Sequence, residues 1–147
     1  MTTMVGTQNN FVDAIRELVE LDFDAIEAYE AASNRIESDE YKVQLQNFKE
    51  DHERHVQELN QLLATHNEKI VSGPDAKKWL TQGKVVVMSL MGDKAILKAM
   101  LTNEEDTNTA YDRVENHPGI WDDSKEILSA GYSDKKRHKL WLEVNIK

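Results

Sequence analysis

The residues of this 147-residue chain that could do chemistry are six ionisable side chains at recurring spacings. In each half of the chain, a carboxylate is followed three residues later by a small residue and seven residues later by a tyrosine. Further along each half, a basic residue precedes a histidine by three positions. The six ionisable residues are Asp22, His52, His55, Glu104, Lys135 and His138. Carboxylates and imidazoles that converge on one point are ligands for divalent iron or zinc, so the set predicts metal binding.

The two occurrences of this pattern are related by a nearly constant offset. The first half contains Asp22-x2-Ala25-x3-Tyr29 and then His52-x2-His55. The second half contains Glu104-x2-Thr107-x3-Tyr111 and then Lys135-x2-His138, at offsets of 82 and 83 residues. Residues three apart lie on one face of a helix, so each such pair can aim at one point. The halves therefore look like duplicated hairpins.

Four long helices are needed to position these residues, and apolar residues recurring every three or four positions predict them. The first helix is expected to begin near Asn10, the second after the Ser38-Asp39 break and the third at the Gly92-Asp93 cap. The fourth is expected after the break at Pro118, with Trp121 in its buried face. No segment alternates with period two, so we expect no strands. The apolar seams of these helices place all six ionisable residues at core positions.

The connections between the predicted helices indicate the fold class, which is all-α. Short links make the first and second helices one antiparallel hairpin and the third and fourth another. Residues 67–92 form a long crossover between the hairpins, and residues 76–90 are expected to form a short helix within it. This is the connectivity of a ferritin-like four-helix bundle. We expect a single domain over residues 1–147, with residues 1–9 as a flexible tail.

On these residues the chain resembles the ferritin-like superfamily of di-iron proteins, which uses a Glu on one helix and Glu-x2-His on its partner, twice. The segment from Gly92 to Leu97, leading to Glu104 and Tyr111, is more narrowly similar to an uncharacterised bacterial branch of these bundles. The resemblance implies Asp22 and Glu104 as the lone carboxylates and His55 and His138 as the histidines. His52 and Lys135 then stand where the family has its bridging glutamates.

These two replacements argue against a conventional di-iron oxidase, because two carboxylates and a lysine cannot balance two divalent ions. Whether the protein is an enzyme stays open. The first hypothesis is one divalent ion, iron or zinc, with a redox or sequestration role. Its ligands come from Asp22, His52, His55, Glu104 and His138, while Lys135 pairs with Glu104 and balances charge. Tyr29 and Tyr111 would lie close to these ligands.

The second hypothesis is a metal-free bundle with no cofactor. Lys135 then bridges Asp22 and Glu104, and the histidines bond to one another and to the tyrosines. Such a protein would have a structural, stress-related or partner-binding role.

Composition limits the remaining classes. A net charge of −9 without a basic stripe argues against nucleic acid as a partner. The absence of cysteine excludes disulfides and thiolate ligands. The longest apolar run, at residues 85–88, is too short to cross a membrane, so we expect a cytoplasmic protein. The apolar residues 85–91 could form a homodimer contact. The acidic run from Glu50 to Glu58, which contains Asp51 and Arg54, is expected to be mostly the solvent-facing side of the second helix.

Overall fold

The computed structural model describes residues 3–73 and 86–147, and four long α-helices dominate them. In chain order these are α1 (Phe11–Arg35), α2 (Asp39–Thr65), α4 (Asp93–Glu115) and α5 (Lys125–Asn145), with a 3-10 turn, η1 (Asp122–Ser124), before α5. The described residues contain no strand, which confirms the all-α class. The short helix expected over residues 76–90 lies largely outside the described residues. Within the described part of this range, residues 86–88 are helical.

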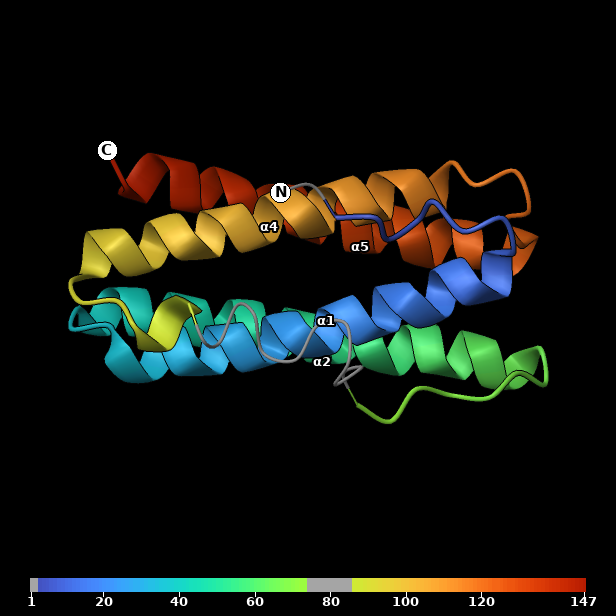
Figure 1. The fold of residues 1–147 in the computed structure, drawn as a ribbon, viewed down its shortest axis with the longest axis horizontal. Coiled ribbons are helices and arrows are strands. Elements are labelled where there is room, and N and C mark those ends of the chain that lie inside the picture. The colour runs from blue at the N-terminus through green and yellow to red at the C-terminus, as the bar shows by residue number, and fades with distance from the viewer. Residues whose placement is uncertain (1–2, 74–85) are drawn as a thin grey trace.

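The helices form a bundle of two hairpins (Figure 1). α1 packs along α2, and α4 packs along α5. The hairpins meet mainly where α1 lies beside α4, whereas α2 and α5 approach one another less closely. All four helices therefore face one shared interior, in which side chains from both hairpins can meet.

The predicted starts of the first three helices are confirmed, and side chains explain them. The Asn10 side chain accepts hydrogen bonds from the backbone N–H groups of Val12 and Asp13, and Ser38 caps α2 in the same way. α4 begins after Gly92, whose φ of +91° lies in the left-handed region that glycine adopts readily. The Asp93 carboxylate then accepts two backbone N–H groups from the α1–α2 link, at 2.7 and 3.0 Å. This contact fixes the start of α4 against the first hairpin.

The fourth long helix begins later than the sequence predicted. α5 starts at Lys125, because the residues after Pro118 form an irregular link that ends in the η1 turn. Trp121 therefore lies in the link rather than on the helix, and it is only partly buried. Its ring stacks on His66, with the centroids 3.7 Å apart, and meets Phe11 edge-on at 5.1 Å. The tryptophan thus covers this end of the bundle instead of filling its centre.

Residues 3–9, which precede α1, lie against α4. Val5 is fully buried, and the Arg113 guanidinium donates hydrogen bonds to the backbone carbonyls of Thr3 and Val5. These contacts involve part of the segment that the sequence predicts as a flexible tail.

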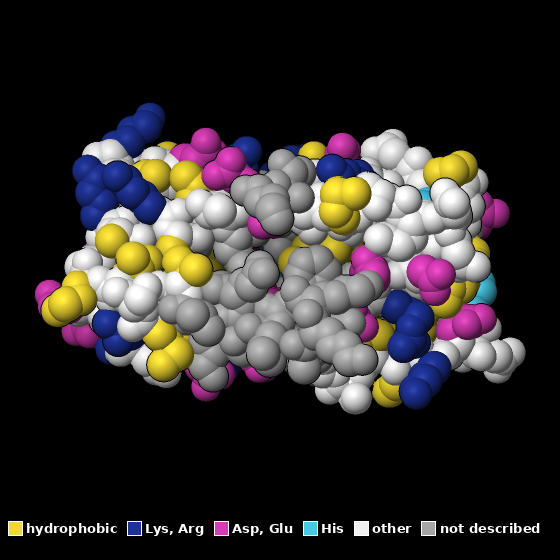
Figure 2. All heavy atoms as spheres, in the orientation of Figure 1, with side chains coloured by type: hydrophobic (Ala, Val, Ile, Leu, Met, Phe, Trp, Pro, Cys, Tyr) yellow, Lys and Arg dark blue, Asp and Glu magenta, His cyan; other side chains and the backbone are white. Residues whose placement is uncertain are grey.

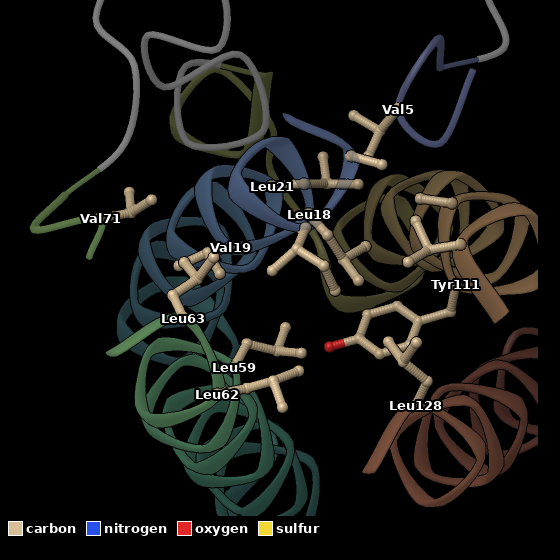
Figure 3. Packing of buried hydrophobic residues seen from close by; sticks show 14 of the residues in the cluster. Val5, Leu18, Val19, Leu21, Leu59, Leu62, Leu63, Val71, Tyr111 and Leu128 are labelled. Carbon is tan, nitrogen blue, oxygen red and sulfur yellow. The ribbon is translucent and has the colours of Figure 1, made fainter. Parts of the chain in front are cut away.

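The interior consists of two apolar clusters with a polar layer between them. One cluster surrounds Leu18, Leu59 and Leu128, and Figure 3 shows their side chains converging from α1, α2 and α5. The other surrounds Phe48, Met100 and Leu142. The six ionisable residues lie on their helices between the members of these clusters, and all six are buried, as the helical seams predicted. Because apolar packing separates this layer from both ends of the bundle, its charged groups must be neutralised from within.

The surface that carries α1 and α4 mixes acidic and basic side chains among its described atoms (Figure 2). Hydrophobic side chains gather on this face toward the end where α4 begins, and Met88 and Met91 in the preceding link are exposed. Within residues 3–73 and 86–147, no helix is long and apolar enough to cross a membrane.

Candidate metal centre

The polar layer consists of two matched clusters, each built around one buried carboxylate. Glu104 on α4 is the centre of one cluster, and Asp22 on α1 is the centre of the other. Each carboxylate accepts a hydrogen bond from a tyrosine of the opposite hairpin. The Tyr29 hydroxyl donates to Glu104 Oε1 at 2.5 Å, and the Tyr111 hydroxyl donates to Asp22 Oδ2 at 2.6 Å. Figure 3 shows the Tyr111 hydroxyl directed into the space between the helices. Each bond links α1 to α4, one with its donor on α1 and the other with its donor on α4.

In the Glu104 cluster, several groups converge on a single oxygen atom. Besides Tyr29, Glu104 Oε1 has His138 Nδ1 at 3.1 Å and His52 Nε2 at 3.4 Å. The other oxygen, Oε2, accepts from the Thr107 hydroxyl at 2.9 Å. Burial alone would raise the pKa of Glu104, but the charge and hydrogen bond of His138 lower it below its ordinary value. Glu104 is therefore an ionised carboxylate inside the bundle.

His52 presents an unpaired nitrogen to this carboxylate. Its Nδ1 lies 2.7 Å from the backbone carbonyl oxygen of Phe48. A carbonyl can only accept, so Nδ1 carries the hydrogen. Burial, together with the positive charges of Lys135 and His138, lowers the pKa of His52 well below its ordinary value. The ring is therefore neutral, and Nε2 carries a lone pair that faces the Glu104 oxygen and has no hydrogen-bond partner.

His138 lies between two carboxylates. Nδ1 approaches Glu104, and Nε2 lies 2.8 Å from Asp51 Oδ2. Burial on its own would lower the pKa of His138, but Glu104 and Asp51 together raise it above its ordinary value. In this arrangement the imidazole is charged and donates from both nitrogens. Asp51 also accepts from Arg137 at 2.8 Å, which fixes the carboxylate that orients the ring.

The Asp22 cluster repeats this arrangement with a lysine in place of His52. Lys135 Nζ lies 2.5 Å from Asp22 Oδ1, and both side chains are buried. The structure therefore pairs Lys135 with Asp22 and not with Glu104. His55 Nε2 lies 2.8 Å from Asp134, while His55 Nδ1 is 4.0 Å from Asp22 and has no hydrogen-bond partner. Burial and the Lys135 charge lower the pKa of His55, although Asp22 and Asp134 oppose the shift. His55 is thus the counterpart of His138, but it is held less closely.

The structure adds four residues that the sequence analysis missed. Asp51 and Arg54 on α2 match Asp134 and Arg137 on α5, at the same 83-residue offset as the histidines. Asp51 was expected on the solvent-facing side of the second helix, but it binds a buried histidine because α5 approaches that side of α2. The signal was present as Asp-x2-Arg-His, which occurs at residues 51–55 and again at residues 134–138.

Three of the five predicted ligands form a group that could hold a metal ion. These are His52, Glu104 and His138, whose candidate ligand atoms all lie within 4.8 Å of one another. Asp22 and His55 lie instead in the cluster that contains Lys135. Two imidazole nitrogens and a carboxylate oxygen suit iron(II) or zinc. The lone pair of His52 Nε2 fits a cation directly, whereas His138 would have to release the proton on Nδ1.

Fold and site together define an all-helical bundle with a buried centre of histidine, carboxylate and lysine side chains. Residues 10–117 match the family described as a domain of unknown function, DUF2383. The match spans most of the chain, so the protein belongs to this family. It includes α1, α2 and α4 but ends before α5, which supplies Lys135 and His138. No curated protein matches the chain, and no solved structure does.

Proposed function

We propose that this protein is a ferritin-like bundle that binds one divalent transition-metal ion, iron or zinc, through His52, Glu104 and His138. Support for the ferritin-like assignment comes from the two antiparallel hairpins and from the carboxylate, tyrosine and histidine positions repeated in each half. The separation between the end of α2 and the start of α4 accords with a long crossover.

The observation that carries the metal assignment is the pair formed by His52 Nε2 and Glu104 Oε1. Both atoms are acceptors, both are buried, and they face one another at 3.4 Å. Two lone pairs at this separation repel each other unless a cation or a proton lies between them. A proton is disfavoured, because burial and two nearby positive charges already lower the pKa of His52. A metal ion bound here would satisfy the unpaired His52 nitrogen and remove its repulsion from Glu104 Oε1, an oxygen that already accepts from Tyr29.

A bound iron would supply redox chemistry, and a bound zinc would supply Lewis acidity or serve in sequestration. The residues of the chain limit access to this centre. Apolar clusters separate the layer from both ends of the bundle. Tyr29 holds Glu104 in place, and Asp51 holds His138. A conventional di-iron centre is disfavoured, because the cluster at Asp22 already contains the Lys135 ammonium.

The alternative is a metal-free bundle whose buried network serves stability or partner binding. Two contacts favour it. Lys135 neutralises Asp22 at 2.5 Å, and His138 in its charged form neutralises Glu104 at 3.1 Å. In that state each carboxylate has a positively charged partner. Only the unpaired nitrogens of His52 and His55 are then left without a role.

Anaerobic titration of the chelator-treated protein with Fe(II) and with Zn(II), followed by calorimetry, separates the two proposals. We expect one ion per chain and a loss of binding in His52→Ala. His55→Ala is the matched control, because it removes a buried imidazole from the cluster that contains Lys135. Circular dichroism of both variants checks that they are folded.

The outcomes are distinct. Metal at about one hundred times its dissociation constant should stabilise the wild-type protein by about 2.7 kcal/mol. Absence of binding by the folded wild-type protein would favour the metal-free alternative. Equal loss of binding in His52→Ala and His55→Ala would extend the ligand set to both clusters, as the sequence first suggested.

A further inference from the structure

The two clusters of the polar layer are related by exchange of the hairpins. Tyr29 bonds Glu104 at 2.5 Å, as Tyr111 bonds Asp22 at 2.6 Å. The outer nitrogens correspond as well, because His138 lies 2.8 Å from Asp51 and His55 lies 2.8 Å from Asp134. The arginines complete the match. Arg137 pairs with Asp51, and Arg54 pairs with Asp134.

The two clusters differ in the basic side chain that faces each carboxylate, and this difference bears on metal binding. Residue 52 is a histidine, and its counterpart 83 positions later is Lys135. His52 Nε2 faces Glu104 at 3.4 Å with a lone pair, while Lys135 Nζ faces Asp22 at 2.5 Å with an ammonium group. In the Glu104 cluster, an unpaired nitrogen that could bind a metal therefore faces the carboxylate. The other cluster presents a fixed positive charge to its carboxylate.

We infer that Lys135 determines the metal stoichiometry of this protein, by occupying with its ammonium group the half of the centre that would otherwise hold a second divalent ion. The inference rests on the proposed function for the location of the first ion. It follows from charge and from geometry. An ammonium offers no lone pair to a metal, and it repels a second cation from Asp22, the buried carboxylate at the centre of its cluster.

The test substitution is taken from the chain itself. Position 135 corresponds to position 52, and in the Glu104 cluster that position is a histidine with an unpaired nitrogen. Lys135→His gives both halves the sequence Asp-His-x-Arg-His. It replaces the ammonium with an imidazole beside Asp22 and His55. The matched control is Lys135→Met, which removes the charge, keeps a side chain of similar length and adds no nitrogen ligand.

Co(II) and Zn(II) are the probes, with bound metal counted per chain and the intensity of the Co(II) absorption bands followed during titration. We expect one ion for the wild-type protein and for Lys135→Met, and two for Lys135→His. One ion in all three proteins would overturn the inference and leave the proposed function intact. If the wild-type protein binds none, the proposed function fails. The inference then stands only if Lys135→His binds one ion more than Lys135→Met.

Loss of the buried ammonium could unfold Lys135→His in the absence of metal, so unfolding is followed with and without Zn(II). If Lys135→His regains its fold when two equivalents of Zn(II) are added, the result supports the inference. If Lys135→His stays unfolded, Lys135→Glu replaces it, because a carboxylate also supplies a ligand at this position. A Lys135→Glu protein that binds no more ions than the wild-type protein would overturn the inference.

Discussion

Removing the buried ammonium should be among the most destabilising changes in this protein. In Lys135→Met, Asp22 loses the ammonium group that pairs with it while remaining buried, and both partners of the pair are almost completely inaccessible in the intact protein. Breaking a buried ion pair by removing one partner costs about 3–5 kcal/mol. Asp22 keeps its hydrogen bond from Tyr111, so we expect the lower end, about 3 kcal/mol. For a domain of this length, that is a fall in melting temperature of roughly 6–12 °C.

The assay is urea unfolding of the metal-free protein in the presence of a chelator, with three variants compared with the wild type. Asp22→Asn combined with Lys135→Met removes both charges and should restore most of the loss, because a neutral pair has no charge to compensate. Lys98→Met, at an exposed site on α4, should change stability by less than about 0.5 kcal/mol. A loss below about 1 kcal/mol in Lys135→Met, or a double variant no more stable than the single one, would refute the reasoning.

Two further predictions concern the histidines and the tyrosines. The metal-free protein should be most stable at about pH 6.5. Burial and nearby positive charges lower the pKa of His52 and His55, so the stability that their neutral forms confer is lost as the pH falls below that value. At His138, burial would lower the pKa, but its two carboxylate partners raise it above the ordinary value. The stability that the charged imidazole confers is therefore lost as the pH rises through the pKa of His138 in the folded protein. Unfolding curves should show the alkaline decline vanish in His138→Gln, and a decline that persisted unchanged would contradict this assignment. Tyr29→Phe and Tyr111→Phe should each cost about 1.5–3 kcal/mol by removing a bond to a buried carboxylate, and clearly unequal losses in denaturant unfolding would count against the matched clusters.

Helical periodicity was enough to predict that the six ionisable residues lie in the core. The seam through Phe11, Leu18 and Tyr29 placed Asp22 inside, and the structure buries all of these residues. The same rule located the polar residues of the other three helices, because a seam residue faces the bundle whatever its polarity. The capping side chain of Asn10 likewise predicted the start of α1, and the break at Ser38-Asp39 predicted the start of α2.

The pairing of side chains across the bundle could not be predicted in this way. Periodicity assigns a residue to the interior but does not say which residue of a neighbouring helix it meets. The contact between Lys135 and Asp22, where we had expected Glu104 to take part, depends on how far along its axis α5 is placed relative to α1. The contact of Asp51 with His138 could not be predicted for a related reason. It lies beside the seam of α2, and it reaches His138 only because α5 is adjacent.

The two tyrosine bonds between the hairpins have a consequence for the ancestry of the fold and for the substitutions that its two halves can accept independently. Each hairpin carries a carboxylate that accepts a hydrogen bond from a tyrosine of the other hairpin, so two copies of one hairpin, related by a two-fold rotation, would make the same pair of tyrosine contacts. The chain is in this sense a homodimer joined into one polypeptide. In a true homodimer every substitution occurs twice, so one side could not hold a histidine where the other holds a lysine. The difference between His52 and Lys135 is therefore open only to the joined chain.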